Sequence, residues 1–138
     1  MHQARGTFDV KVSPLAEDAV GKATGVGRLQ LDKRFHGSLQ ASSVGQMLAS
    51  GNGRTFGAYV AIEKVKGNLD GRTGTFDLVH HARMNGGVPE AWTVSVVPGS
   101  GTGELEGISG AMVIEITDGV HHYEFSYAIE GRGGAAAP

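Results

Sequence analysis

The sequence lacks several features on which common functions depend. It contains no cysteine, which excludes disulfides, iron–sulfur clusters, cysteine-ligated zinc and a thiol nucleophile. Its 12 basic and 14 acidic residues nearly balance, so the charge offers no attraction to nucleic acid or to an anionic membrane. Apolar runs stay well short of the roughly 18 residues of a membrane-spanning helix. We therefore expect a cytoplasmic protein that binds neither nucleic acid nor membrane.

Helical periodicity is scarce, whereas glycine is abundant. Glycine makes up 23 of 138 residues, more than twice the average share of about 7%, which is typical of a β-rich fold with many tight turns. The best helical candidate, residues 15–22, is limited by Gly21 and Gly25 and is interpreted as a loop or a single turn. We expect one domain over residues 1–130, followed by a disordered Gly/Ala tail at 131–138.

Alternation of apolar and polar residues is the dominant pattern. It predicts eight strands, at residues 7–12, 28–35, 38–49, 55–66, 73–84, 90–97, 111–117 and 121–129. Asp70-Gly71, Asp118-Gly119 and Asn52-Gly53 lie between such runs and suit two-residue type I′ turns, because both central positions need positive φ. His36-Gly37 is a weaker turn signal of this kind. The prediction is a single all-β domain, an eight-stranded antiparallel meander β-barrel with little or no helix.

Two-residue turns also predict which side chains face each other. A turn at Asp70-Gly71 places Glu63 opposite Leu78 and Ala61 opposite His80. A turn at Asp118-Gly119 gives a matching apolar face on the last two strands. The predicted inner face is Leu29, Leu31, Phe35, Val65, Phe76, Leu78, Trp92, Val94, Val96, Met112, Ile114, Ile116, Tyr123, Phe125, Tyr127 and Ile129. Polar interruptions of this face are Glu63, His80, His121 and, as a further candidate, Gln46.

Several ordered motifs resemble a known family. They are Phe35-His36-Gly37, Tyr59-Val60-Ala61-Ile62-Glu63, Gly71-Arg72-Thr73-Gly74-Thr75-Phe76, Val96 through Leu105, and Asp118-Gly119-Val120-His121-His122-Tyr123. Together they resemble the bacterial domain-of-unknown-function 3224 family from about Gly6 to Ile129. The resemblance implies an allene-oxide-cyclase-like barrel with a central cavity. Other enzymes of this barrel type cyclise or isomerise apolar, polyene or polyketide-like substrates. In Val79-His80-His81-Ala82 the chain departs from relatives, which usually have one histidine here.

Glu63 and His80 are the candidate catalytic residues. The predicted register places them diagonally on neighbouring strands, within reach of each other, and a carboxylate beside an imidazole can serve as acid and base near neutral pH. The alternative is a structural hydrogen-bonded pair that braces the barrel. Because the two readings need the same contact, the sequence leaves both open.

The remaining inner face supplies candidate ligand contacts. These are Tyr59, Phe76, Leu78, Trp92, Met112, His121, Tyr123 and Phe125. The tyrosine hydroxyls could orient a ligand, although each of these residues could equally be a core or rim side chain.

We expect no metal, because the adjacent histidine pairs point to opposite faces of a strand, and no cofactor. Ser100 lacks the strand–helix setting of a nucleophile, and Pro98 to Gly103 is read as a wide turn.

Two functions are consistent with such an interior. One is a cofactor-free isomerase or cyclase that acts on an apolar metabolite held in the barrel cavity. The other is a non-catalytic binding or carrier barrel for the same kind of ligand.

On the outer face, Phe56, Val60, Ile62 and Val79 form an apolar row, and exposed apolar patches usually mark interfaces. We therefore also expect a homo-oligomer, a symmetric dimer built partly on this hairpin.

Overall fold

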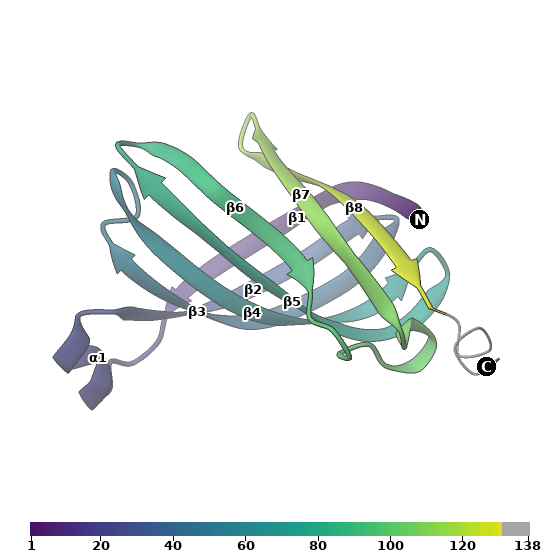
Figure 1. Ribbon diagram of the computed structural model, residues 1–138, viewed down its shortest axis with the longest axis horizontal. Helices are drawn as coiled ribbons and strands as arrows, with labels where there is room; N and C mark the ends of the chain where they lie inside the picture. Colours follow the sequence, from purple (N-terminus) through teal and green to yellow (C-terminus); the bar gives the residue numbers. More distant parts are fainter. Residues whose placement is uncertain (131–138) are drawn as a thin grey trace.

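The protein is an eight-stranded antiparallel barrel, as predicted. The structure is a computed structural model that describes residues 1–130, so the expected tail at 131–138 lies outside the described residues. Consecutive strands pair in a meander, and β1 closes the barrel by pairing with β8 (Figure 1). The elements are β1 (His2–Pro14), α1 (Ala19–Thr24), β2 (Gly27–Gly37), β3 (Leu39–Gly51), β4 (Phe56–Leu69), β5 (Arg72–Asn85), β6 (Val88–Val96), the 3-10 helix η1 (Gly103–Leu105), β7 (Ile108–Thr117) and β8 (Val120–Ile129).

Two tight turns set the registers that the sequence predicts. Asp70 and Gly71 both have positive φ, at 51° and 92°, and so do Asp118 and Gly119, at 52° and 78°, as a type I′ turn requires. Glu63 consequently pairs with Leu78 in the β4–β5 ladder. The β7–β8 ladder likewise has its predicted register. Alternation and these two turns together therefore assign the inward faces of the four strands correctly.

The β3–β4 connection differs from its prediction. Asn52-Gly53 does not form a two-residue turn, because the strands end at Gly51 and resume at Phe56. The Asn52 side chain accepts hydrogen bonds from the backbone N–H groups of Arg54 and Thr55, both at 2.8 Å, and this network organises a wider loop.

Gln46 is also corrected, because it faces outward. It is exposed and pairs with the outward-facing Ile62, while its neighbour Met47 is half-buried. The weak alternation of β3 and the wide loop that follows it left the facing of this strand undetermined.

The excursion between β1 and β2 carries a short helix. Asp18 caps α1 by accepting a hydrogen bond from the Gly21 N–H at 2.8 Å, and Gly25 ends it in the left-handed conformation with φ 73°. The predicted loop or single turn is therefore a capped helix that extends to Thr24. The helix lies at the surface, beyond the barrel wall (Figure 1). None of the helices within residues 1–130 has the length and apolar character needed to cross a membrane.

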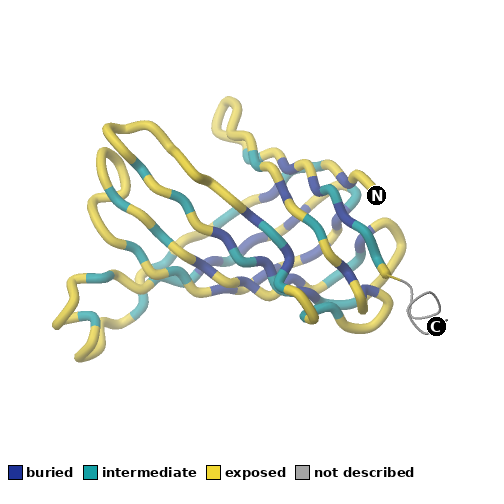
Figure 2. The backbone as a smooth tube through the Cα atoms, viewed as in Figure 1, coloured by how far each residue is buried: buried dark blue, intermediate teal, exposed yellow. Residues whose placement is uncertain are grey.

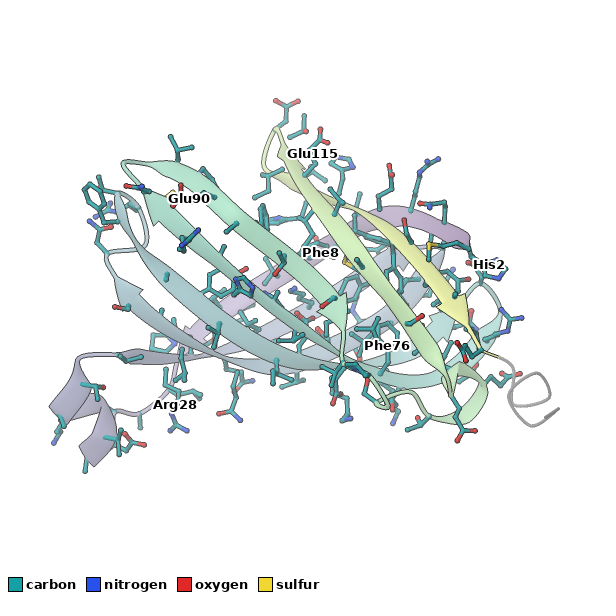
Figure 3. All side chains as sticks on the ribbon, in the orientation of Figure 1. His2, Phe8, Arg28, Phe76, Glu90 and Glu115 are labelled. Carbon is teal, nitrogen blue, oxygen red and sulfur yellow. The ribbon has the colours of Figure 1, made fainter. Side chains whose placement is uncertain are left out.

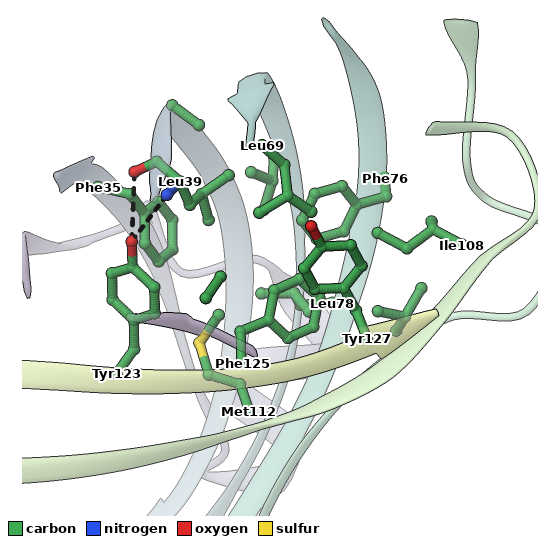
Figure 4. Close-up of a cluster of buried hydrophobic side chains, with 14 of the residues drawn as sticks. Phe35, Leu39, Leu69, Phe76, Leu78, Ile108, Met112, Tyr123, Phe125 and Tyr127 are labelled. Atoms are coloured by element: carbon green, nitrogen blue, oxygen red, sulfur yellow. Dashed lines mark hydrogen bonds between the residues drawn. The ribbon is translucent and has the colours of Figure 1, made fainter. Parts of the chain in front are cut away.

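The two halves of the barrel interior differ in packing. Buried positions concentrate in the half that holds the two chain termini, and exposed positions in the other half (Figure 2). We call these halves the closed end and the mouth. At the closed end Phe125 stacks between Phe76 and Tyr127, with ring centroids 5.8 and 5.3 Å apart. Leu39 and Leu69 fill the space beside these rings (Figure 4).

The wall is weakest between β6 and β7. Within residues 1–130 the ladder between these strands consists of one pair, Ser95 with Ala111, and the strands diverge toward the mouth (Figure 1). β6 also carries a bulge opposite Ala82, where Ala91 has a φ of 53°. A bulge bends its strand and redirects side chains. Here it leaves Trp92, predicted to face inward, at the rim with 39% of its surface exposed.

Candidate functional site

A buried cluster of polar side chains crosses the middle of the barrel, centred on the carboxylate of Glu63. The His80 Nε2 atom lies 2.8 Å from Glu63 Oε2, and the two side chains are 6% and 0% exposed. The predicted diagonal contact across β4 and β5 is therefore present. Ser43, from β3, donates a hydrogen bond to Glu63 Oε1 at 2.7 Å.

Lys33 completes the cluster, although it was not among the site residues predicted from the sequence. Its Nζ lies 2.8 Å from Glu63 Oε2, with 6% of its side chain exposed. The ammonium also sits 4.8 Å from the ring centroid of Phe8, a cation–π contact. Phe8 is labelled among the side chains in Figure 3. The signal was present in the sequence, because Lys33 continues the inward alternation of Leu31 and Phe35.

The surroundings of Glu63 stabilise its charged form. Burial by itself raises the pKa of Glu63. The hydrogen bond from His80, the charge and hydrogen bond of Lys33, and the hydrogen bond from Ser43 all lower it. The result is a pKa of about 2, below the ordinary value of 4.5. Glu63 is therefore ionised at neutral pH, and Lys33 balances its charge. Among residues 1–130, every buried side-chain nitrogen or oxygen has a hydrogen-bond partner.

A glycine on the facing strand provides the space for Glu63. Gly45 pairs with Glu63 in the β3–β4 ladder. A Cβ at this position would lie 2.5 Å from the Cβ of Glu63 and 2.6 Å from the carbonyl oxygen of Ile62. Because these contacts involve backbone and Cβ atoms, a larger residue here would displace the strand that carries Glu63.

Tyr59 connects the buried cluster to the mouth. Its hydroxyl lies 3.1 Å from Nδ1 of His80, the nitrogen that does not face Glu63. Burial raises the pKa of Tyr59, a hydrogen bond with Trp92 opposes that rise, and the charge of Glu63 adds to it. Tyr59 is therefore a neutral phenol near pH 7. The chain Tyr59–His80–Glu63 forms a continuous hydrogen-bonded path from the mouth to the middle of the barrel.

The mouth contains a cavity of about 490 Å³, within the range of roughly 300–1,000 Å³ typical of ligand pockets. Its lining is mostly apolar and comprises, among others, Leu29, Met47, Ala49, Tyr59, Ala82, Met84, Pro89, Trp92 and Ile116. Glu63 and His80 lie behind Tyr59, outside this lining. Tyr59 is the member of the hydrogen-bonded path that lines this cavity.

The predicted ligand contacts divide into two groups. Tyr59 and Trp92 line the cavity. Phe76, Leu78, Met112, Tyr123 and Phe125 instead belong to the packed core. His121 is half-buried and contacts the ring of Phe8, with centroids 5.0 Å apart. The sequence could not separate the two groups, because all of them share the inward face and differ only in depth along the barrel.

Tyr123 and Tyr127 use their hydroxyls within the fold. The Tyr123 hydroxyl accepts a hydrogen bond from the Leu39 N–H at 3.0 Å and donates one to the carbonyl of His36 at 2.8 Å; it points at the Leu39 backbone in Figure 4. Tyr127 donates to the carboxylate of Asp70. Burial, this bond and the Asp70 charge raise the pKa of Tyr127 to about 12. Both tyrosines thus brace the closed end.

The cluster does not have the donor set of a metal site. Among residues 1–130, no three His, Asp or Glu side chains converge as a bound metal would require. Around Glu63 the other groups are a histidine, a lysine and a serine, and the lysine ammonium occupies the place where a cation would sit.

Comparison with known proteins gives a family without a known activity. A family model described as a protein of unknown function (DUF3224) matches residues 4–127. The chain is also similar to a crystal structure of a protein with unknown function from the DUF3224 family of Shewanella oneidensis MR-1. The two share 45% sequence identity with a TM-score of 0.85, and the match covers 95% of this chain and 98% of the other. No curated protein matches the chain.

Proposed function

Since this chain belongs to the DUF3224 family of proteins of unknown function, its activity has to be inferred from the site, and we propose that it is a cofactor-free isomerase or cyclase. Its substrate is an apolar small molecule held in the mouth cavity. The observation that carries this proposal is the hydrogen-bonded path from the cavity through Tyr59 and His80 to the ionised Glu63. The family resemblance implies an allene-oxide-cyclase-like barrel, and other enzymes of that barrel type cyclise or isomerise apolar substrates, which supports the same class of reaction.

The path supplies acid–base chemistry without any added group. A proton leaves the substrate toward Tyr59 as the Tyr59 proton moves to Nδ1 of His80, and the imidazolium that forms lies against Glu63. Reversing the path returns a proton to another substrate atom, so the product is an isomer and no oxidant or reductant is needed. The apolar walls hold the substrate in one conformation, which favours a single product.

The experiment begins with the molecule that the protein carries. Native mass spectrometry of the purified protein, followed by extraction, identifies a bound apolar compound. Incubating that compound with the protein in D2O should give a product with a new retention time, the same carbon skeleton and deuterium taken from the solvent. His80→Ala should abolish this conversion while retaining the compound. A compound recovered unchanged from the wild-type protein would overturn the catalytic proposal.

The second candidate function is binding without turnover. It is favoured by the hydrogen bonding of Glu63, whose carboxylate accepts hydrogen bonds from Lys33, Ser43 and His80. A cluster with a purely structural role would have the same hydrogen bonds. Glu63→Gln distinguishes the two candidates. A carrier keeps its ligand in this variant and has no activity to lose, whereas the enzyme loses turnover with its ligand affinity retained.

We further propose that the protein forms a homodimer through its outer wall. Phe56, Val60 and Ile62 on β4 are 60%, 53% and 55% exposed, so they face outward as the predicted register requires. On β3, Val44 and Leu48 extend the same surface at 58% and 48% exposure. These five residues define the outer apolar patch. A patch of this kind supports association of two copies.

A further inference from the structure

The direction of each hydrogen bond in the path follows from the charge of Glu63. Its pKa of about 2 leaves it an ionised carboxylate at neutral pH, which can only accept hydrogen bonds. The hydrogen between Glu63 and His80 therefore resides on Nε2 of His80. In the neutral imidazole, Nδ1 then has a free lone pair, and it accepts the hydrogen of the Tyr59 hydroxyl 3.1 Å away.

This assignment determines what Tyr59 offers to a molecule in the cavity. With its hydrogen directed at His80, the phenol presents its oxygen as an acceptor. A hydroxyl oxygen can accept hydrogen bonds while it donates its own hydrogen. The Tyr59 oxygen can therefore accept a hydrogen bond from a ligand.

The other polar side chains that border the cavity, Ser50, Asn52 and Arg83, are exposed, whereas Tyr59 is half-buried. The Asn52 side chain holds its own loop through the backbone of Arg54 and Thr55. Arg83 lies 3.7 Å from a carboxylate oxygen of Glu90, on an exposed part of the wall. Tyr59 is therefore the half-buried polar side chain of a mostly apolar cavity.

We propose that the cavity takes an apolar molecule that carries a hydroxyl group, and that this hydroxyl donates a hydrogen bond to the Tyr59 oxygen. The corresponding ketone binds more weakly, because its oxygen would face another acceptor. This inference rests on the proposed use of the cavity and adds the chemical class of the ligand. The inference also identifies the group that supplies the first proton of the proposed relay. The ligand hydroxyl donates its proton toward Tyr59 as Tyr59 donates its own toward His80.

Two rigid probes of one shape test the proposal, 2-decalol and 2-decalone. Calorimetric titration at pH 8, where an imidazole is ordinarily neutral, gives both affinities. Trp92 lines the cavity and is the one tryptophan of the chain, so a change in its emission places each probe there. We expect the alcohol to bind about five- to tenfold more tightly than the ketone, the effect of roughly one hydrogen bond.

Three variants separate the role of Tyr59 from general effects on the cavity. Tyr59→Phe should make the two affinities equal. His80→Leu, which removes the acceptor for the Tyr59 hydrogen and frees that hydrogen for a ligand, should reverse the preference toward the ketone. His81→Leu, the same change at the exposed neighbour on the outward face of β5, should leave the wild-type ratio. Thermal unfolding checks that each variant is folded.

The outcomes distinguish this inference from the proposed function. Equal binding of both probes by the wild-type protein, or a preference that survives in Tyr59→Phe, overturns the hydroxyl-ligand inference and leaves the cavity as a binding site. Failure of both probes to bind, with the Trp92 emission unchanged, counts against the cavity function and this inference together. A ratio that reverses only in His80→Leu supports the assigned hydrogen-bond direction.

Discussion

The closed end and the mouth of this barrel are built from the same alternating strands but differ in the side chains that occupy their inward positions. At the closed end, inward positions carry aromatic and aliphatic side chains that fill the space, and the tyrosine hydroxyls are bound to the fold. Toward the mouth, the same inward positions carry a charge-balanced cluster and then a cavity. The packed core and the cavity are therefore separated along the barrel axis.

The largest effect should come from breaking the packed half. Phe125 is fully buried between two rings, and Phe125→Ala should lower the free energy of unfolding by about 3–5 kcal/mol. Met47→Ala should cost less than about half of that, because Met47 borders the cavity and loses fewer contacts. Urea unfolding of both variants measures the contrast. Equal losses would show that the two halves are packed alike.

Removing the cation of the central cluster should have an effect of similar size. Lys33→Met keeps the apolar stem but leaves the buried Glu63 charge without its counterion, which should cost about 3–5 kcal/mol. Lys64→Met is the matched control, since Lys64 pairs with Asp77 at 2.8 Å with 60% of its side chain exposed and should cost less than about 1 kcal/mol. Adding Glu63→Gln to Lys33→Met should recover part of the loss; no recovery would argue against charge imbalance as the cause.

The dependence of stability on pH should sharpen the role of the cluster. The pKa of Glu63 is about 2 in the folded protein against an ordinary 4.5. Its contribution is therefore complete above pH 4.5 and is lost as the pH falls from 4.5 to 2. The loss should amount to about 3 kcal/mol. The measurement is the free energy of unfolding across this window for the wild type and Glu63→Gln. Parallel curves would contradict the lowered pKa.

A substitution on the outer wall should have the smallest effect on stability, and its main effect should be on the association of two copies. Ile62→Lys places a charge in the outer apolar patch, at a position that is already 55% exposed. The free energy of unfolding of the protomer should change by less than about 0.5 kcal/mol, while the proposed dimer dissociates. Analytical ultracentrifugation at tens of micromolar, about the concentration at which a standard interface is occupied, tests this. A monomeric wild type would refute the dimer.

Much of the barrel could be predicted because its signals are local. Alternation and two Asp-Gly turns were enough for the β4–β5 and β7–β8 registers, and hence for the contact between Glu63 and His80. Lys33 was missed although alternation places it inward, because a lysine is rarely buried unless it is paired. Its partner Glu63 was already on the predicted inner face, so the pairing could have been inferred.

The remaining features depend on distances that no local pattern contains. Ser43 and the outward facing of Gln46 follow from the β3 register, and the Asn52-Gly53 signal predicted a two-residue turn where the structure has a wider loop. The depth of Tyr59 relative to Phe76 depends on how far along the barrel each side chain lies. The position of Trp92 depends on the bulge at Ala91. Positive φ favours glycine, so an alanine at this position gives no sequence signal for a bulge.

The one-pair ladder between β6 and β7 gives this closed barrel a partly open seam. Along the mouth half of the seam, each strand presents a backbone edge that could pair with a strand of another molecule, the contact from which sheet aggregation begins. β6 carries protection against it. Pro89 removes a backbone donor, and the bulge at Ala91 interrupts the regular edge. The residues that interrupt β6 therefore protect the seam from pairing with further strands.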